Sequence, residues 1–280
     1  MSGSKTLGIG CAEMHLRTAP ALEGVAWMRA GVTLLLRQPM AHLALMGFMF
    51  FAFGMLLGIQ KIGPIVVLIL VPSLNAGWVA CNAALSIGQP VSPLTLLAPL
   101  RSASRSKLLV LGCLHAVASI AMLVLADLID PDFHQHWRAA LREQPASDDT
   151  LSEAAFHGLQ SGMLLRLLCL LPVALLFWHA PVILHRLPGT SVAKALFASG
   201  LASLRNIKPF VIYLVSWVLA DLILSLLIGV LLSLFGAGGG LAVFVLVPVM
   251  LLFAGAFYTS MHASVHGCLL FDDIPVETTV

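Results

Sequence analysis

The chain has 280 residues, of which 59% are hydrophobic and only 10% are charged, and its mean hydropathy is +0.99. Because soluble domains carry about 25% charged residues, this composition excludes an ordinary water-soluble protein and indicates a protein of the lipid bilayer. The small net charge of +2, without any long run of basic residues, argues against a nucleic-acid partner.

The first twenty residues contain charged side chains but no apolar stretch of the kind found in a cleaved signal peptide. We therefore predict a disordered cytoplasmic tail over residues 1–20, a membrane domain over residues 21–273 and a second cytoplasmic tail over residues 274–280. The transmembrane helices themselves are expected to direct insertion.

Six apolar runs approach or reach the roughly 20 residues that a helix needs to cross the hydrocarbon core. They cover about residues 40–59, 62–85, 108–129, 163–184, 210–235 and 241–261. Helices are required because lipid satisfies no backbone polar group, and none of the runs shows the alternation of a barrel strand. We predict an all-α integral membrane protein whose six transmembrane helices form three hairpins.

An amphipathic segment precedes each predicted hairpin, over residues 22–37, 92–105 and 191–205. Apolar residues at helical spacing, flanked by Arg or Lys, are typical of a helix that lies in the headgroup region and meets anionic lipid. The alternative is a cytoplasmic loop helix packed on the bundle. The candidate contacts to lipid headgroups are Arg29, Arg37, Arg101, Arg105, Lys194 and Arg205.

The basic residues also predict an orientation. If the six runs cross the membrane in turn, the N-terminus, the connection between the second and third runs, the connection between the fourth and fifth runs, and the C-terminus share one side. Eleven of the fifteen Lys and Arg residues lie on that side. Since cytoplasmic segments carry the excess of Lys and Arg, we expect both termini to be cytoplasmic.

A polar insert, residues 130–162, follows the third run and is expected to hold two short helices, over residues 133–144 and 150–159. Its residues His134, His136 and His157 are the types that bind divalent metals, but their spacing is not diagnostic and favours a solvated acidic loop. His262 and His266 share a helix face, yet lack an evident third ligand. The five cysteines have no paired spacing. We predict no disulfide, metal site or cofactor.

Polar side chains inside the apolar runs form a candidate intramembrane site: Asp221, His115, His179, Asn75 and Asn82. Asp221 is the one carboxylate near the centre of a run, where a charge is costly and usually faces a partner or a cavity. It can serve as a proton or cation relay, or as a structural anchor bonded to a neighbouring helix, and the lack of a basic residue at matching depth favours the anchor. The two asparagines most simply make interhelical hydrogen bonds.

Prolines fall in the second helix of every predicted hairpin, at Pro64, Pro72, Pro172, Pro181 and Pro248. We expect them to interrupt these helices. Broken helices at corresponding positions are found in transporters, although prolines also bend membrane helices for packing alone.

The sequence resembles a known group of membrane proteins in its glycine and proline positions. Residues 71–77 read Val-Pro-Ser-Leu-Asn-Ala-Gly and residues 88–93 read Gly-Gln-Pro-Val-Ser-Pro. With the preceding amphipathic segment, this order resembles a family of uncharacterised proteobacterial inner-membrane proteins. More remotely, it is similar to the six-helix membrane domain of some bacterial glycerophosphodiester phosphodiesterases. The resemblance implies an inner-membrane location and an architecture.

The common catalytic motifs are absent, including the phosphate loop, the zinc-protease motif and the nucleophile elbow, so we do not expect an enzyme or a catalytic residue. The predicted function is a scaffold or a lipid-interacting membrane component whose partners are the lipid bilayer and anionic lipid headgroups. The alternative is a small-solute or proton-coupled transporter with a midplane site near Asp221.

Overall fold

The computed structural model describes residues 14–142, 153–235 and 240–271, and it is mostly helical. Within these ranges, six stretches of helix are long and apolar enough to cross a membrane. They are Pro39–Leu57, Gly63–Ser86, Arg105–Ile129, His157–Arg186, Ile207–Ser233 and Leu246–Cys268. Each predicted apolar run overlaps one of these candidate spans, which confirms the prediction of a mostly helical protein with six candidate membrane spans.

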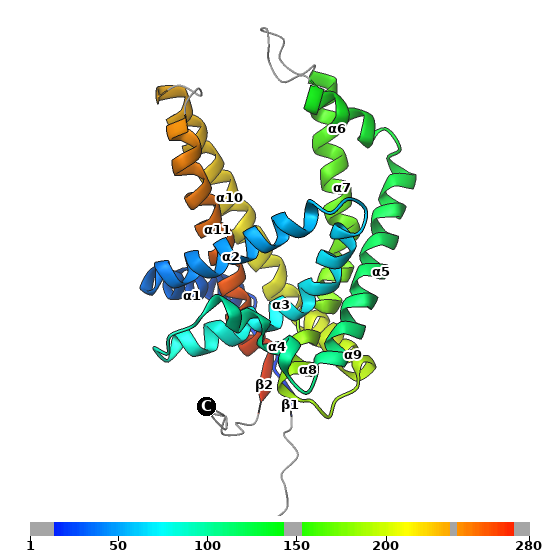
Figure 1. Cartoon of the computed structure of the whole chain (residues 1–280), viewed down its shortest axis with the longest axis vertical. Helices are drawn as coiled ribbons and strands as arrows, with labels where there is room; N and C mark the ends of the chain where they lie inside the picture. The colour runs from blue at the N-terminus through cyan, green and yellow to red at the C-terminus, as the bar shows by residue number, and fades with distance from the viewer. Residues whose placement is uncertain (1–13, 143–152, 236–239, 272–280) are drawn as a thin grey trace, which may run out of the picture. The chain divides into compact units, whose positions relative to one another are not determined.

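The elements follow one another along the chain, with short connections between most helices (Figure 1). Their bounds are β1 (Met14–Leu16), α1 (Glu23–Arg37), α2 (Pro39–Leu57), α3 (Gly63–Ser86), the 3-10 helix η1 (Pro93–Leu97), α4 (Ala98–Arg101), α5 (Arg105–Ile129), α6 (Phe133–Arg142), α7 (Glu153–Phe177), α8 (Ala180–Arg186), α9 (Val192–Arg205), α10 (Ile207–Phe235), α11 (Gly240–Cys268) and β2 (Leu269–Phe271). They form two compact units. The first unit takes the described residues of 1–46, 82–90 and 201–280, and the second takes 47–81 and the described residues of 91–200.

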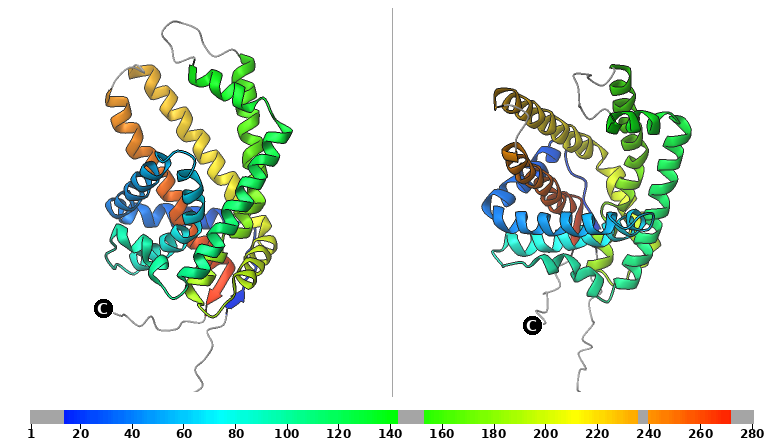
Figure 2. Two further views of the ribbon diagram at one scale, coloured as in Figure 1. Left: turned by 45° about the vertical axis from the view of Figure 1, so that its right-hand side comes forward. Right: turned by 45° about the horizontal axis from the view of Figure 1, so that its top comes forward.

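In the first unit, α1 packs across both α10 and α11 (Figures 1 and 2). A stripe with helical spacing, Gly24, Trp27, Gly31 and Leu35, is buried in this contact. The two glycines permit it: a Cβ at Gly24 would lie 2.2 Å from the carbonyl oxygen of Pro209, and one at Gly31 would lie 2.5 Å from backbone atoms of Ser260. The predicted amphipathic segment over residues 22–37 is therefore a helix with one face packed on its neighbours.

The two ends of the described chain are tied together in the first unit. Strands β1 and β2 pair antiparallel, and the buried Asn206 side chain accepts a hydrogen bond from the backbone N–H of Ala19 (2.7 Å) and donates to the carbonyl of Arg17 (2.9 Å). The prediction of a disordered tail through residue 20 is therefore wrong from residue 14 onward, because a polar side chain 187 and 189 positions later in the chain supplies partners to Ala19 and Arg17. Residues 1–13 and 272–280 lie outside the described residues.

In the second unit, α5 and α7 run side by side and α6 packs on α7 (Figures 1 and 2). Helix α5 also contacts α8. The Ser104 hydroxyl donates to the carbonyl of Leu184 (2.6 Å), and Lys107 Nζ donates to the carbonyls of Pro188 (2.5 Å) and Thr190 (2.9 Å). The start of α5 therefore satisfies carbonyl groups at and beyond the end of α8, which the helix itself leaves without partners.

The segment over residues 92–105 differs from the prediction of one amphipathic helix. It consists of η1, whose N-cap is Ser92, followed by the short helix α4. Prolines at positions 93 and 99 lack the backbone N–H that a continuous helix would use, so each lies in the first turn of a short element.

Two further expectations for the helices are wrong. The second short helix predicted in the insert is part of α7, which begins at Glu153 and continues into the fourth span; residues 143–152 lie outside the described residues. The prolines at positions 72, 172 and 248 lie inside uninterrupted helices, and Pro64 is in the first turn of α3. Only Pro181 accompanies a break, between α7 and α8.

Candidate functional site

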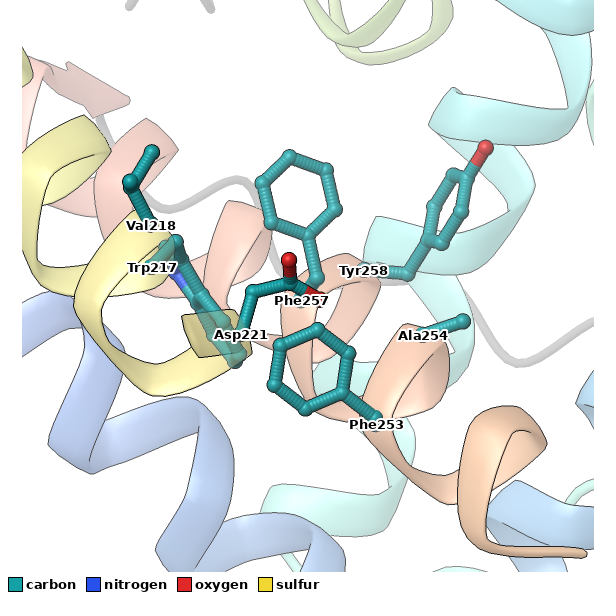
Figure 3. Close-up of a pocket in the computed structure, with 7 residues that line it drawn as sticks. All are labelled: Trp217, Val218, Asp221, Phe253, Ala254, Phe257 and Tyr258. Carbon is teal, nitrogen blue, oxygen red and sulfur yellow. The ribbon is translucent and has the colours of Figure 1, made fainter. Parts of the chain in front are cut away.

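Asp221 lies in the middle part of α10 and lines a shallow pocket of about 360 Å³ against α11 (Figure 3). Its lining residues recur at three- to four-residue spacing, so one face of each helix supplies them. They are Trp217, Val218 and Asp221 from α10, and Phe253, Ala254, Phe257 and Tyr258 from α11. The pocket is therefore a carboxylate set among aromatic and small apolar side chains.

The Asp221 carboxylate is exposed at this pocket. Among the described residues it has no hydrogen bond or ion pair, so the structure supplies no evidence for the expected anchor bond to a neighbouring helix. An acidic side chain near the centre of a membrane helix costs roughly 2.5 to 3.5 kcal/mol on insertion scales. Such a cost is normally offset by a partner, and the pocket beside the carboxylate is where a partner of opposite charge has room.

The aromatic wall of the pocket is held in place by ring contacts. The Trp217 ring meets the ring of Phe253 at 5.4 Å and 84° and that of Phe257 at 5.5 Å and 78°, both edge-to-face geometries. Behind this wall, the oxygens of Tyr213 and Ser260 lie 2.6 Å apart. Since the Ser260 hydroxyl donates to the carbonyl of Phe257 (2.6 Å), Tyr213 is the donor to Ser260. The Tyr213–Ser260 bond therefore links α10 to α11 one helical turn from Trp217.

Both predicted histidines lie in the second unit, and each has its own surroundings. His115 Nδ1–H donates to the carbonyl of Leu68 (2.8 Å), which joins α5 to α3, and its ring packs on Phe177 at 5.1 Å. His179 is fully buried at the start of α8, where its backbone N–H donates to the hydroxyl of Ser199 (3.0 Å). These contacts connect helices, and they involve different partners for the two side chains.

Asn82 is buried and faces His42, a residue that the sequence interpretation missed. His42 Nε2 lies 3.1 Å from Asn82 Oδ1, and His42 Nδ1 lies 2.9 Å from the carbonyl oxygen of Gln38. Both ring nitrogens therefore face oxygen acceptors, and a neutral ring donates from one of the two. Asn75 is half-buried in the second unit, whereas Asn82 belongs to the first. The sequence did contain a signal for His42, since it is an ionisable residue inside the first apolar run.

A charged cluster at the junction of α5, α6 and α7 was also missed as a unit. Arg166 forms ion pairs with Asp127 and with Asp130 (3.3 Å), and its guanidinium lies over the Phe133 ring at 3.5 Å. His134 Nε2 approaches Asp127 at 3.4 Å. The acids are three residues apart at the end of α5, a spacing that presents both to one partner. This cluster ties the insert to the ends of two candidate spans.

All six predicted headgroup contacts are exposed. They are Arg29 and Arg37 on α1, Arg101 on α4, Arg105 on α5, and Lys194 and Arg205 on α9. Exposed apolar side chains accompany them, namely Leu22 before α1, Leu36 on α1, and Phe197 and Leu204 on α9. The free faces of α1 and α9 therefore mix basic and apolar groups.

The histidines considered as metal ligands do not assemble into a site in the described structure. Within the described ranges, no group of three or more His, Cys, Asp or Glu side chains is placed to hold a metal ion. The rings of His262 and His266 contact each other at 4.5 Å, as expected for one helix face. The cysteines Cys81, Cys113, Cys169 and Cys268 form no disulfide within the described residues, and Cys11 lies outside them.

A comparison with known proteins finds a membrane-protein relative. No protein-family model matches the chain, and no solved structure matches it. The chain is similar to a probable inner membrane protein of Burkholderia thailandensis, with 28% identity over 260 residues that cover 91% of this chain and 94% of the relative. With its six candidate spans, this likeness identifies a multi-pass inner membrane protein. The remoter similarity to the membrane domain of phosphodiesterases stays a prediction.

Proposed function

We propose that the protein is a non-enzymatic, lipid-interacting component of the inner membrane that holds anionic lipid headgroups on its cytoplasmic face. The observation that carries this proposal is the exposure of all six basic candidates beside exposed apolar side chains. A surface that mixes both kinds of side chain suits the boundary between headgroups and acyl chains. Each exposed Lys or Arg near an anionic surface contributes about 1 kcal/mol.

The proposed arrangement is three hairpins, each entered through a basic segment, with both termini in the cytoplasm. Support comes from chain order: if each consecutive pair of candidate spans crosses and returns, the N-terminus and the connections before α5 and α10 share one side. That side then carries eleven of the fifteen Lys and Arg residues. Alkaline phosphatase, which is active only outside the cytoplasm, should be inactive when fused to the C-terminus and active when fused after Asp132. The reverse result would contradict the orientation.

The lipid role is tested by native mass spectrometry of the full chain, purified from membranes of known composition. The variant Arg29→Gln, Arg37→Gln, Lys194→Gln, Arg205→Gln should retain less than about half of the bound phosphatidylglycerol and cardiolipin, because it loses exposed cationic partners of the phosphates. The control, Lys61→Gln with Arg138→Gln, removes two exposed basic residues from the opposite predicted side, and the double variant Arg29→Gln, Arg205→Gln matches it in charge. Equal retention in all of these proteins would contradict the proposal.

A transporter is the second candidate, and the Asp221 pocket is the specific observation that favours it. A carboxylate in a midspan pocket is suited to bind a cation or a proton during transport. Transport requires uptake or efflux that depends on Asp221 in sealed vesicles. A lipid-interacting component without transport activity should give the same solute fluxes with Asp221→Asn as with the original chain.

A further inference from the structure

We propose that the Asp221 pocket binds a lipophilic organic cation, such as a quaternary ammonium or phosphonium ion with apolar substituents. This site goes beyond the lipid-interacting role proposed above, because it lies on α10 and α11 and uses none of the six basic residues. It also does not require transport, since binding alone would give the carboxylate a counter-charge.

The charge of the occupant follows from Asp221. The carboxylate lies about midway along the candidate span Ile207–Ser233 and is exposed. Its pocket brings no basic side chain: the other six lining residues are aromatic or aliphatic. Within the described chain no ion pair reaches Asp221. Complementarity therefore selects a cation and excludes an anion.

The chemical class of the cation follows from the lining. Hard metal ions such as Ca²⁺ and Mg²⁺ take about six or more oxygen ligands, whereas this pocket has a single carboxylate, and the Tyr258 hydroxyl is directed away from it (Figure 3). Organic cations with spread charge instead gain from the faces of aromatic rings, with Trp the strongest ring. Trp217, Phe253 and Phe257 supply such rings beside the carboxylate (Figure 3).

The pocket wall is built before any ligand arrives. Trp217 is packed edge-to-face against Phe253 and Phe257, and the Tyr213–Ser260 hydrogen bond fastens the two helices one turn away. Because the rings already contact one another, a ligand would not lie between them; it would rest on the open side of the wall, against Asp221. A pocket of about 360 Å³ accommodates the head of such a cation, with its substituents on the apolar surface of α10.

The test uses the full-length protein in nanodiscs made of zwitterionic lipid, with tetraphenylphosphonium as the probe and equilibrium dialysis as the readout. We expect saturable binding of one cation per chain. Asp221→Asn should weaken it at least tenfold, whereas Asp221→Glu should restore most of it. Trp217→Leu should weaken binding several-fold more than Trp217→Phe, which keeps an aromatic face. Asp132→Asn, which neutralises an exposed acid outside the spans, is the matched control and should bind as the original chain does.

A charge-reversed probe separates site binding from simple partition. Tetraphenylborate has nearly the same shape as tetraphenylphosphonium but a negative charge, so it should show no saturable binding that depends on Asp221. Equal behaviour of the two probes, or tetraphenylphosphonium binding that is unchanged in Asp221→Asn, would overturn the site. A third result would also overturn the site: the protein forms dimers that dissociate in Asp221→Asn, and no cation binds. The carboxylate would then face a second copy of the chain.

Two measures keep the test independent of folding and of the lipid proposal. Size-exclusion chromatography and thermal melting identify any variant that fails to fold, and the comparison of Trp217→Phe with Trp217→Leu stands without Asp221→Asn. The quadruple basic variant should bind tetraphenylphosphonium as tightly as the original chain. Loss of lipid retention with intact cation binding, or the converse, shows which of the two proposals fails.

Discussion

Two regions of the molecule hold acidic side chains in or at candidate spans. The acids of one region form ion pairs, and the acid of the other does not. In the second unit, Asp127 and Asp130 meet Arg166, whose side chain is only 11% exposed and also lies over the Phe133 ring. In the first unit, Asp221 stands in an apolar pocket and has no ion pair within the described chain.

The difference separates a structural charge from a candidate ligand site. A carboxylate that is matched inside the fold stabilises it, and removal of its partner leaves an uncompensated charge. A carboxylate that is left unmatched near the middle of a span opposes stability and persists where something outside the fold uses it. Stability measurements should therefore respond with opposite signs in the two regions.

The largest effect is expected at Arg166. Arg166→Met leaves two carboxylates close together without their cation, and should lower the free energy of unfolding by about 2 kcal/mol. This figure lies below that of a fully buried pair because 40% of the Asp127 side chain and 25% of the Asp130 side chain are exposed. Reversible unfolding in mixed micelles measures it. The control Arg138→Met changes an exposed arginine nearby and should stay within about 0.5 kcal/mol. Equal stability of both variants would contradict a structural role for the cluster.

The next-largest change in the free energy of unfolding is expected at the two acids that pair with Arg166. Asp127→Asn or Asp130→Asn alone should cost about 1 kcal/mol or less, because the remaining carboxylate still pairs with the guanidinium. The double variant leaves Arg166 without a carboxylate and should cost more than the sum of the two single changes. A double-mutant cycle on the same unfolding measurement gives this coupling. Strict additivity would mean that the acids act independently.

At Asp221, removal of the charge should not lower the free energy of unfolding. Asp221→Leu removes an unpaired charge from the middle of a span and should leave the free energy of unfolding unchanged or raise it by about 1 kcal/mol. Val218→Leu, a neighbour in the same pocket with no change of charge, is the control. A loss of about 2 kcal/mol in Asp221→Leu, matching that in Arg166→Met, would show that Asp221 is a structural acid and end the contrast between the two regions.

The sequence predicts one of these regions better than the other, for a physical reason. Apolar runs of membrane length identify the spans because the bilayer imposes that length, and an acid inside such a run is visible at once, as Asp221 is. The pairing of Arg166 with acids 36 and 39 residues earlier depends on how α5 and α7 pack, which no local pattern encodes.

The same limit applies to the polar contacts within the first unit. Asn206 was visible only as part of a connection before the fifth span, while its partners Arg17 and Ala19 fell in the supposed tail. His42 was inside an apolar run and was passed over, although its role depends on Asn82, 40 positions later. Helix class and span positions were predictable from local composition, whereas the partners of buried polar groups required the tertiary structure.

The smallest effect is expected at the edge of the charged cluster, where His134 approaches Asp127 at 3.4 Å but is 57% exposed. His134→Gln should change the free energy of unfolding by less than about 0.5 kcal/mol, because water competes for an exposed pair of this kind. Phe133→Leu, one position earlier, removes the ring beneath the Arg166 guanidinium and should cost clearly more. Unfolding in the same micelles compares the two variants. If His134→Gln instead lowers the free energy of unfolding as much as Phe133→Leu, the histidine is a full partner in the charged cluster. The paired charges of the second unit then include α6 as well as α5 and α7.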